Sequence, residues 1–252
     1  MECRIGHVTF SGGMPKICVP LTGTELSDLM SECELTRNSA AELVEWRVDF
    51  FKDALCTEKV LAVLPKLKES LGHLPLIFSF RTKDEGGEKA ISLEQYVSLN
   101  KAVAASGYID GMDIEWFKKE HEALELVEVA KENRVTVILS NHDFAGTPER
   151  DELVNRVERA LQLGADIPKL AVMPKCPEDV LNLLDVSLTM KRTHPEQAAI
   201  MIAMGKLGVV TRLSGEIFGS SITFATLKNA SAPGQIAAGK MKEILELIHS
   251  GN

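Results

Sequence analysis

The stretch RVTVILSNHD (134–143), followed by TPERDELVNRVERALQLG (147–164) and IPKLAVMP (167–174), holds the pattern that decides the fold. The outer segments are short runs rich in Val, Ile and Leu, which are typical of buried strands. The middle segment repeats apolar residues three and four positions apart, among them Leu153 and Val157, which is typical of an amphipathic helix. A strand, a helix and a second strand in this order predict a unit with two parallel strands.

The same pattern of a strand followed by a helix recurs along the whole chain. Eight segments are strand-like: KICVPL (16–21), LVEWRVDF (43–50), LPLIFSFRT (74–82), IDGMDIEW (109–116), RVTVILSNHD (134–143), IPKLAVMP (167–174), AAIMIAMG (198–205) and ITFATL (222–227). Units of about thirty residues predict an α/β fold of the (β/α)8 TIM-barrel type. A doubly wound sheet is the alternative, because periodicity does not report closure.

The ends and the composition of the chain complete this interpretation. Residues 4–15, RIGHVTFSGGMP, predict a short N-terminal β extension that closes the bottom of the barrel. Because no Gly/Ser/Pro-rich linker or low-complexity segment divides the chain, we expect a single barrel domain over residues 1–252. The chain is 45% hydrophobic and carries a net charge of −8 without a Lys/Arg block, so a nucleic-acid partner is not expected.

Cysteine and histidine usage favours a cytoplasmic protein that needs no metal or other cofactor. The five cysteines form no C-x-x-C pair: Cys3, Cys18, Cys33, Cys56 and Cys176. No H-x-H or H-E-x-x-H motif occurs either. No signal-peptide core and no membrane-spanning apolar run is found, so no membrane association is expected.

Ionisable residues gather where five successive predicted strands end. They are Glu45, Arg47, Asp49, Arg81, Glu85, Asp113, Glu115, His142, Asp143 and Lys169. The carboxyl ends of parallel barrel strands meet on one side, and side chains two apart on a strand share a face. We therefore expect these groups to surround one site for an anionic small molecule.

Each of these residues also has an ordinary structural alternative. Glu45 and Arg47 can form a rim ion pair, which contributes little to stability. His142 can cap a turn, Asp113 can accept backbone amides, and Arg81 can be a solvated rim charge. The joint pattern favours the site, because structure alone gives no reason for so many charges at one end.

Lys169 is the most informative of these residues, because it lies inside the apolar run GADIPKLAVMP (164–174). It can extend its ammonium to water, pair with a buried carboxylate, or act as a nucleophile after desolvation. A free lysine amine attacks a ketone to form an imine, which acidifies the neighbouring C–H bond. With His142 to move that proton and Glu85 to orient the imidazole, the residues predict a Schiff-base lyase.

Six segments in order resemble the type I 3-dehydroquinate dehydratases of the shikimate pathway. They are ELVEWRVDFF (42–51), FSFRTKDEGGE (78–88), SNHDF-x-x-TP (140–148), LGADIPKLAVMP (163–174), RLSGEIFGS (212–220) and SAPGQI (231–236). The resemblance implies a barrel, usually a homodimer, that dehydrates 3-dehydroquinate to 3-dehydroshikimate by syn elimination without metal.

The resemblance also assigns roles to individual residues. It implies that Lys169 forms the imine, that His142 is the general base and acid, and that Glu85 orients His142. It further implies that six residues bind the substrate: Glu45, Arg47 and Arg81 at the ring hydroxyls, and Arg212, Ser231 and Gln235 at the carboxylate and the neighbouring hydroxyl. Residues 228–236 are expected to form a lid.

Two departures from the family pattern and two alternative functions stay open at this point. Pro20 stands where many relatives carry a small polar residue, which predicts the loss of a minor substrate contact. Gly205 and Leu207 replace the usual alanine and acidic residue, which predicts a looser loop. The alternatives are another class I, aldolase-type barrel enzyme and a non-catalytic binder of a shikimate-pathway acid.

Overall fold

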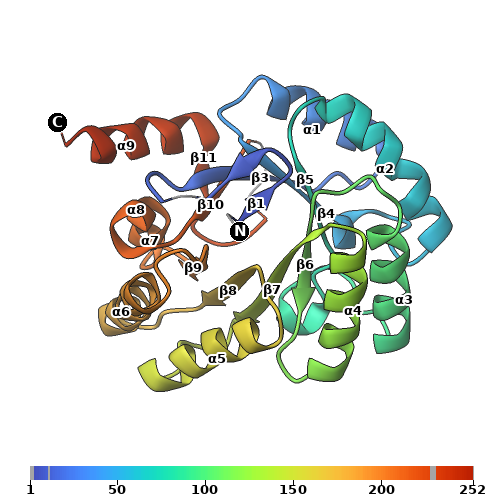
Figure 1. Ribbon diagram of the computed structural model, residues 1–252. Coiled ribbons are helices and arrows are strands. Elements are labelled where there is room, and N and C mark those ends of the chain that lie inside the picture. The colour runs from blue at the N-terminus through green and yellow to red at the C-terminus, as the bar shows by residue number, and fades with distance from the viewer. Residues whose placement is uncertain (1–2, 11, 228–230, 252) are drawn as a thin grey trace.

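A computed structural model describes residues 3–10, 12–227 and 231–251. It shows a ring of strands surrounded by helices (Figure 1). The strands are β1 (Arg4–Ile5), β2 (Val8–Thr9), β3 (Lys16–Leu21), β4 (Leu43–Arg47), β5 (Leu76–Ser79), β6 (Gly111–Glu115), β7 (Thr136–Asp143), β8 (Ile167–Val172), β9 (Ile200–Ala203), β10 (Ile222–Thr226) and β11 (Ile236–Ala237). The helices are α1 (Leu26–Arg37), α2 (Thr57–Leu71), α3 (Leu93–Ala104), α4 (Glu120–Glu132), α5 (Arg150–Gln162), α6 (Pro177–Thr193), α7 (Val209–Leu213), α8 (Gly215–Phe218) and α9 (Ala238–Ser250), with 3-10 turns η1 (Val48–Phe50) and η2 (Lys83–Glu85).

The order of the strands shows that the sheet curls into a barrel. From β3 to β9 each strand pairs in parallel with the next one along the chain, and β10 returns to pair with β3. The strand order of a doubly wound sheet would reverse at a switch point, and it does not. The predicted (β/α)8 architecture is therefore confirmed, and the alternative is wrong.

One seam of the barrel, between β9 and β10, is joined differently from the rest. Among the described strands no ladder connects these two. Instead, the N–H groups of alternate residues along this edge donate to hydroxyls: Ala199 to Ser221, Met201 to Ser220 and Ala203 to Thr211, at 3.3, 3.1 and 3.0 Å. Because these hydroxyls satisfy buried amides, the seam needs no regular pairing.

The interior and exterior of the barrel follow the alternation of side chains along each strand. On β8, Leu170 and Val172 point outward and pack with Leu153 and Val157 of α5 in one apolar cluster. Ile167, on the other face of β8, belongs to a second cluster that includes the first residues of several strands and extends to Ala171 and Phe224. The helices thus cover the outer face, and a separate core fills the inside of the barrel.

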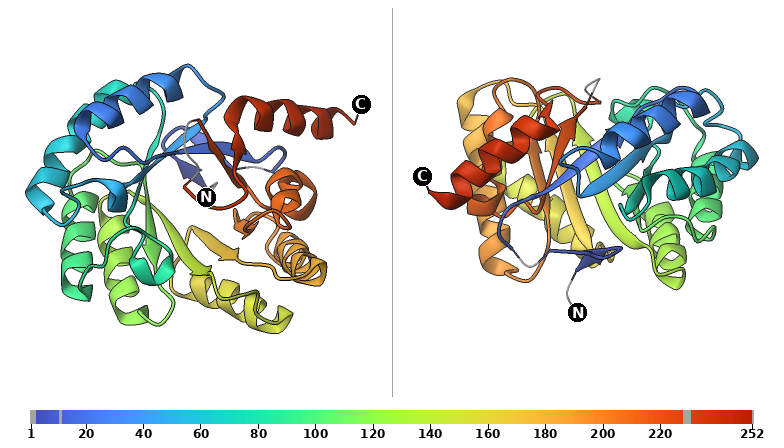
Figure 2. Two further views of the ribbon diagram at one scale, coloured as in Figure 1. Left: turned by 180° about the vertical axis from the view of Figure 1, so that it is seen from behind. Right: turned by 90° about the horizontal axis from the view of Figure 1, so that it is seen from above.

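The hairpin of β1 and β2 packs against that separate core. Ile5 and Phe10 are buried in it, at the end of the barrel where the strands begin (Figure 2, right). A Cβ added to Gly111 would lie 3.3 Å from side-chain atoms of both Ile5 and Ile77, so the glycine leaves room for Ile5. The hairpin is the β element expected before the first barrel strand; that it closes the bottom stays a prediction.

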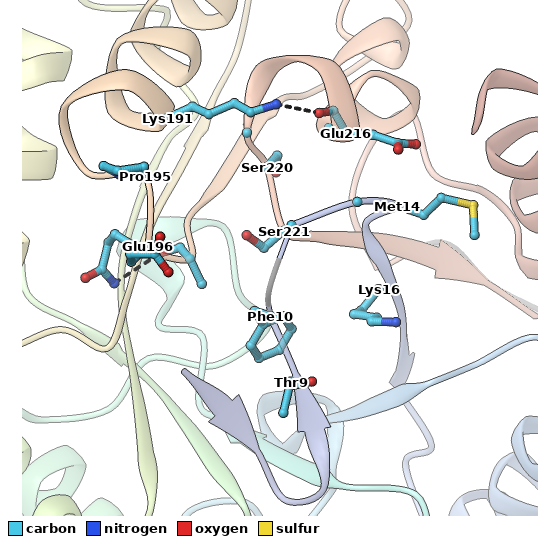
Figure 3. A pocket seen from close by; sticks show the side chains of 16 residues that line it. Thr9, Phe10, Met14, Lys16, Lys191, Pro195, Glu196, Glu216, Ser220 and Ser221 are labelled. Atoms are coloured by element: carbon cyan, nitrogen blue, oxygen red, sulfur yellow. Dashed lines mark hydrogen bonds between the residues drawn. The ribbon is translucent and has the colours of Figure 1, made fainter. Parts of the chain in front are cut away.

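A shallow pocket lies beside this hairpin, below the seam between β9 and β10 (Figure 3). Ser220, Ser221 and Phe10 line it, and Lys191 closes one side by donating to the carbonyl oxygens of Glu216 and Ile217 at 2.8 and 3.2 Å. Lys191 of α6 is thus occupied in holding α8, and Ser220 and Ser221 accept from the edge of β9. The residues predicted for function lie elsewhere.

None of the helices in the described part of the chain is long and apolar enough to cross a membrane.

Candidate active site

All nine residues predicted for catalysis or substrate binding line one cavity at the carboxyl ends of the strands. They are Glu45, Arg47, Arg81, Glu85, His142, Lys169, Arg212, Ser231 and Gln235. The cavity encloses ≈ 500 Å³ of space, its open mouth included. That volume lies in the range of sites for small molecules.

Lys169 lies at the floor of this cavity and is only 5% exposed. Its Nζ donates to Oδ2 of Asp113 at 2.6 Å and lies 3.9 Å from Oε1 of Glu45. The same ammonium lies 4.6 Å from the ring centroid of Phe224. Of the three predicted alternatives, extension to water is wrong and pairing with a buried carboxylate is confirmed.

Arg81 connects the carboxylates beneath the cavity. Its Nη2 donates to Asp113 at 2.7 Å, and its Nη1 donates to Glu115 at 3.2 Å and to Ser140 at 3.0 Å. Arg81 is buried, so the solvated rim charge is a wrong interpretation. The side chain of Asp113 is held by Lys169, Arg81 and Ser140, and it accepts no backbone amide in these contacts.

These neighbours decide the charge of Asp113. Burial by itself acts to raise its pKa, but Arg81 and Lys169 outweigh burial and hold the pKa of Asp113 well below its usual range. Asp113 is therefore an ionised partner of Lys169. Arg81 shares the same carboxylate, so Asp113 lies between two cations.

His142 and Glu85 are hydrogen-bonded to each other. Oε2 of Glu85 lies 2.9 Å from Nδ1 of His142 and accepts the backbone N–H of His142 at 2.9 Å. Burial, then Arg81 and Lys169, lower the pKa of His142 well below its usual range. Burial and the charge of Glu115 raise the pKa of Glu85 to about 8. The imidazole is therefore uncharged at neutral pH, and its Nδ1 is engaged with Glu85.

Arg47 lies at the rim, and its partner is Asp49 rather than Glu45. Two parallel hydrogen bonds of 2.8 Å join the guanidinium to Asp49, because β4 ends at Arg47 and η1 turns Asp49 back toward it. Glu45 instead accepts from Ser79 at 2.7 Å. The interpretation of Glu45 and Arg47 as a rim ion pair is wrong.

Arg212, from α7, is a buried guanidinium without a carboxylate partner among the described residues. Its Nη2 donates to the carbonyl of Pro233 at 3.0 Å, and its Nε has no hydrogen-bond partner in that part of the chain. Burial lowers the pKa of Arg212 to about 10, so it stays charged at neutral pH. An incompletely paired buried cation that borders a cavity is suited to bind an anion.

The segment after β10 carries Ser231 and Gln235 to the mouth of the cavity. Oε1 of Gln235 accepts the N–H of Ser231 at 2.8 Å, and Nε2 donates to the Ser231 hydroxyl at 3.0 Å. Gly205 donates its N–H to Pro233 at 3.2 Å and has a φ of +70°, which favours glycine. Residues 228–230 of the expected lid lie outside the described residues.

Three neighbours of these groups received no role from the sequence. Asp113 was visible as a charge two residues from Glu115, but its pairing with Lys169 bridges 56 positions of the chain. Phe224 and Phe144 line the cavity. Phe144 packs so close to Gly86 that an added Cβ there would lie 2.3 Å from the ring. An isolated phenylalanine in a strand or loop has no sequence signal that separates it from an ordinary core residue.

Within the described ranges, no three His, Cys, Asp or Glu side chains are arranged to hold a metal ion. The polar groups that line the cavity are arginine and lysine cations, an imidazole, two carboxylates, a hydroxyl and an amide. What this site offers a ligand is an amine, a base and positive charge.

Comparison with known proteins identifies the family. The model of the type I 3-dehydroquinase family matches residues 17–252. The chain belongs to this family. Proteins named 3-dehydroquinate dehydratase are similar over nearly their whole length: that of Bacillus licheniformis is 46% identical and that of Listeria innocua 45%, with 98% and 97% of this chain and 97% of each relative covered.

Solved structures agree. The type I 3-dehydroquinate dehydratase of Clostridium difficile, solved with covalent modified comenic acid, superposes with a TM-score of 0.95 at 39% identity, covering 100% of this chain and 98% of that one. The enzyme of Geobacillus kaustophilus gives 0.94 at 35% identity, covering 99% and 97%. The prediction of a hydro-lyase of the type I 3-dehydroquinate dehydratase class is confirmed. The aldolase and the non-catalytic binder are thereby set aside.

Proposed function

We propose that this chain converts 3-dehydroquinate to 3-dehydroshikimate by syn elimination through an imine on Lys169. The observation that carries the proposal is a buried lysine amine in the same cavity as an uncharged histidine and several cations. The structure of the Clostridium difficile relative with covalent modified comenic acid supports covalent chemistry in this family.

Lys169 supplies the nucleophile. After losing a proton, its amine adds to the C3 ketone and water leaves, which forms a protonated imine. The positive imine nitrogen then withdraws electrons from C2. Asp113 fixes the amine at the floor of the cavity, and Phe224 supports it from the side. Water later hydrolyses the product imine and restores the free amine.

His142 moves the proton. Uncharged and with Nδ1 bonded to Glu85, it presents Nε2 to take the C2 proton. The electrons form an enamine, which expels the C1 hydroxyl as His142 returns the proton, so that water leaves. Glu85 keeps the imidazole in the required orientation throughout.

The remaining cavity residues hold the substrate. Arg212 is placed for the carboxylate, since it is charged, buried and incompletely paired. Ser231 and Gln235 add contacts to the carboxylate and a neighbouring hydroxyl from the segment above it. Three further residues hold the ring hydroxyls: Glu45, Arg47 and Arg81.

Borohydride trapping tests this proposal. Protein treated with borohydride and 3-dehydroquinate should carry the reduced ligand on the peptide ADIPKLAVMPK, and Lys169→Ala should lose both labelling and turnover. We expect turnover of that variant to fall by at least about 10⁴-fold, followed through the absorbance of the enone product. Labelling of Lys175, the neighbouring lysine in the same peptide, with Lys169→Ala still active, would overturn the mechanism.

Other features of the protein are also proposals. The family resemblance supports a homodimer, and the five free cysteines suit a reducing cytoplasm. The continuous barrel supports one domain over residues 1–252. Sedimentation at several protein concentrations would test the dimer.

A further inference from the structure

A buried carboxylate behind the cavity has no role in the chemistry described above. Glu115 ends β6, is 1% exposed and is not part of the cavity lining. Its Oε1 accepts from Thr82 N–H at 2.7 Å and from Arg81 at 3.2 Å. Its Oε2 accepts from the Thr82 hydroxyl at 2.7 Å and from Lys119 at 3.1 Å. Both carboxylate oxygens of Glu115 thus accept two hydrogen bonds each, from a backbone amide, a hydroxyl and two cationic side chains.

These contacts reach the Glu85–His142 pair by two routes. Thr82 comes directly before η2, and its carbonyl accepts the N–H of Glu85 at 3.0 Å. Nη1 of Arg81, which Glu115 holds, also lies 3.7 Å from Oε2 of Glu85. Glu115 thus anchors both the turn that carries Glu85 and the nearest cation to it.

We propose that Glu115 is a positioning residue that fixes Arg81 and the turn bearing Glu85 and, through its charge, sets the protonation of the Glu85–His142 pair. The inference rests on the proposed role of His142. It adds a residue that contacts neither the substrate nor the reacting atoms.

The charges that face Glu85 from each neighbouring element define the expected direction. His142 of β7 bonds to Glu85, Arg81 follows β5, Glu115 ends β6, and Lys119 precedes α4. After burial, Glu115 acts to raise the pKa of Glu85, whereas Arg81 and Lys119 act to lower it. Removing the charge of Glu115 should therefore lower this pKa, and removing the charge of Lys119 should raise it.

The ionisation of Glu85 governs the base. Only an ionised Glu85 requires the proton on Nδ1 of His142, which leaves Nε2 free to accept. Turnover should accordingly rise with pH through an inflection that belongs to the pair rather than to one residue. Glu85→Gln should remove that inflection.

The experiment compares two charge variants of opposite sign with a surface control. Glu115→Gln should move the inflection of kcat about one pH unit lower, and Lys119→Met should move it higher. Glu125→Gln on α4, which loses an exposed ion pair with Lys101 of α3, should leave it unchanged. ¹⁵N signals of His142, assigned by their loss in His142→Ala, should shift with the same inflection without any need for turnover.

Several results would overturn the inference. Shifts of the same sign in both variants, or no shift in either, would show that Glu115 acts only as a structural contact. An inflection that survives in Glu85→Gln would do the same. If Glu115→Gln does not fold, the shift in Lys119→Met decides alone. The Lys119 side chain is partly exposed, so we expect that variant to fold. Borohydride labelling of Lys169 is a separate measurement. Its failure would contradict the proposed function, whereas failure of the pH shifts would contradict only the role of Glu115.

Discussion

The amino ends of the barrel strands bury apolar side chains, whereas the carboxyl ends bury charged side chains as well, although the same strands supply both. On β8, Ile167 lies in the apolar cluster near the hairpin, and Lys169, two residues further on the same face, lies in the charged cavity. On β7, Ile138 and His142 show the same change. A few ångströms along one strand separate a hydrocarbon core from a network of ions.

The difference teaches which end stabilises the barrel and which end holds a site. Burial of apolar side chains is favourable without any partner, so the amino end needs only good packing. Buried charges cost desolvation energy, and even paired ones are weak evidence for stability. Asp113 accepts hydrogen bonds from Arg81 and Lys169, and these bonds replace those that the three groups would make to water. Arg212, by contrast, has an Nε without a hydrogen-bond partner among the described residues. The carboxyl end therefore favours ligand binding at some expense of stability.

The sharpest way to break this comparison is to remove the base. His142→Ala should still form the imine but turn over at least about a hundredfold more slowly, because proton transfer loses its carrier. Stopped-flow turnover and borohydride trapping check the two parts. Loss of labelling, or turnover near that of the unaltered protein, would contradict the assignment. The melting temperature should change little.

A second variant at the same end tests binding rather than chemistry. Arg212→Ala should raise KM at least about tenfold, because the carboxylate loses a charge-assisted partner. Gln235→Ala and Ser231→Ala should raise KM less. Steady-state kinetics measure all three.

Limited proteolysis in residues 228–236 gives an independent check on the lid. Cleavage should slow when borohydride-trapped ligand is present. Equal rates with and without ligand would reduce this segment to a plain connection.

A variant at the apolar end should show the reverse behaviour. Ile167→Ala leaves a cavity in the core and should lower the free energy of unfolding by about 2–5 kcal/mol, while kcat and KM stay nearly unchanged. Urea unfolding and kinetics on the same sample measure both. Leu181→Ala, at a side chain that is 64% exposed, is the matched control and should change neither. A loss of kcat in Ile167→Ala would contradict the separation of stability at the amino end from catalysis at the carboxyl end.

The smallest effect is expected from chelation. Prolonged EDTA treatment should leave turnover unaltered, since the proposed chemistry needs only side chains. The assay of enone formation checks it against an untreated sample. Activity that is lost and then restored by zinc or magnesium would contradict a metal-independent site.

Much of the site was predictable because the residues that form it stand out in the local sequence. Residues at strand ends must lie at one end of a barrel, and Lys169 stands out because an apolar run surrounds it. Apart from Glu85 with His142, the pairings were not predictable. An ion pair between Glu45 and Arg47 was one alternative, but the turn after β4 brings Asp49 to Arg47 instead. Nothing in the neighbourhood of Asp113 along the chain points to Lys169.

The sequence by itself determined the order of strands and helices, the end of the barrel that carries charge, and the family, since periodicity and contiguous motifs are properties of the chain alone. Only the tertiary structure decided which charges meet. The contacts of Lys169 with Asp113 and of Arg81 with Glu115 join different strands or turns. Their distances depend on strand register, curvature and the turn after each strand, and these arise only when the ring of strands packs as a whole.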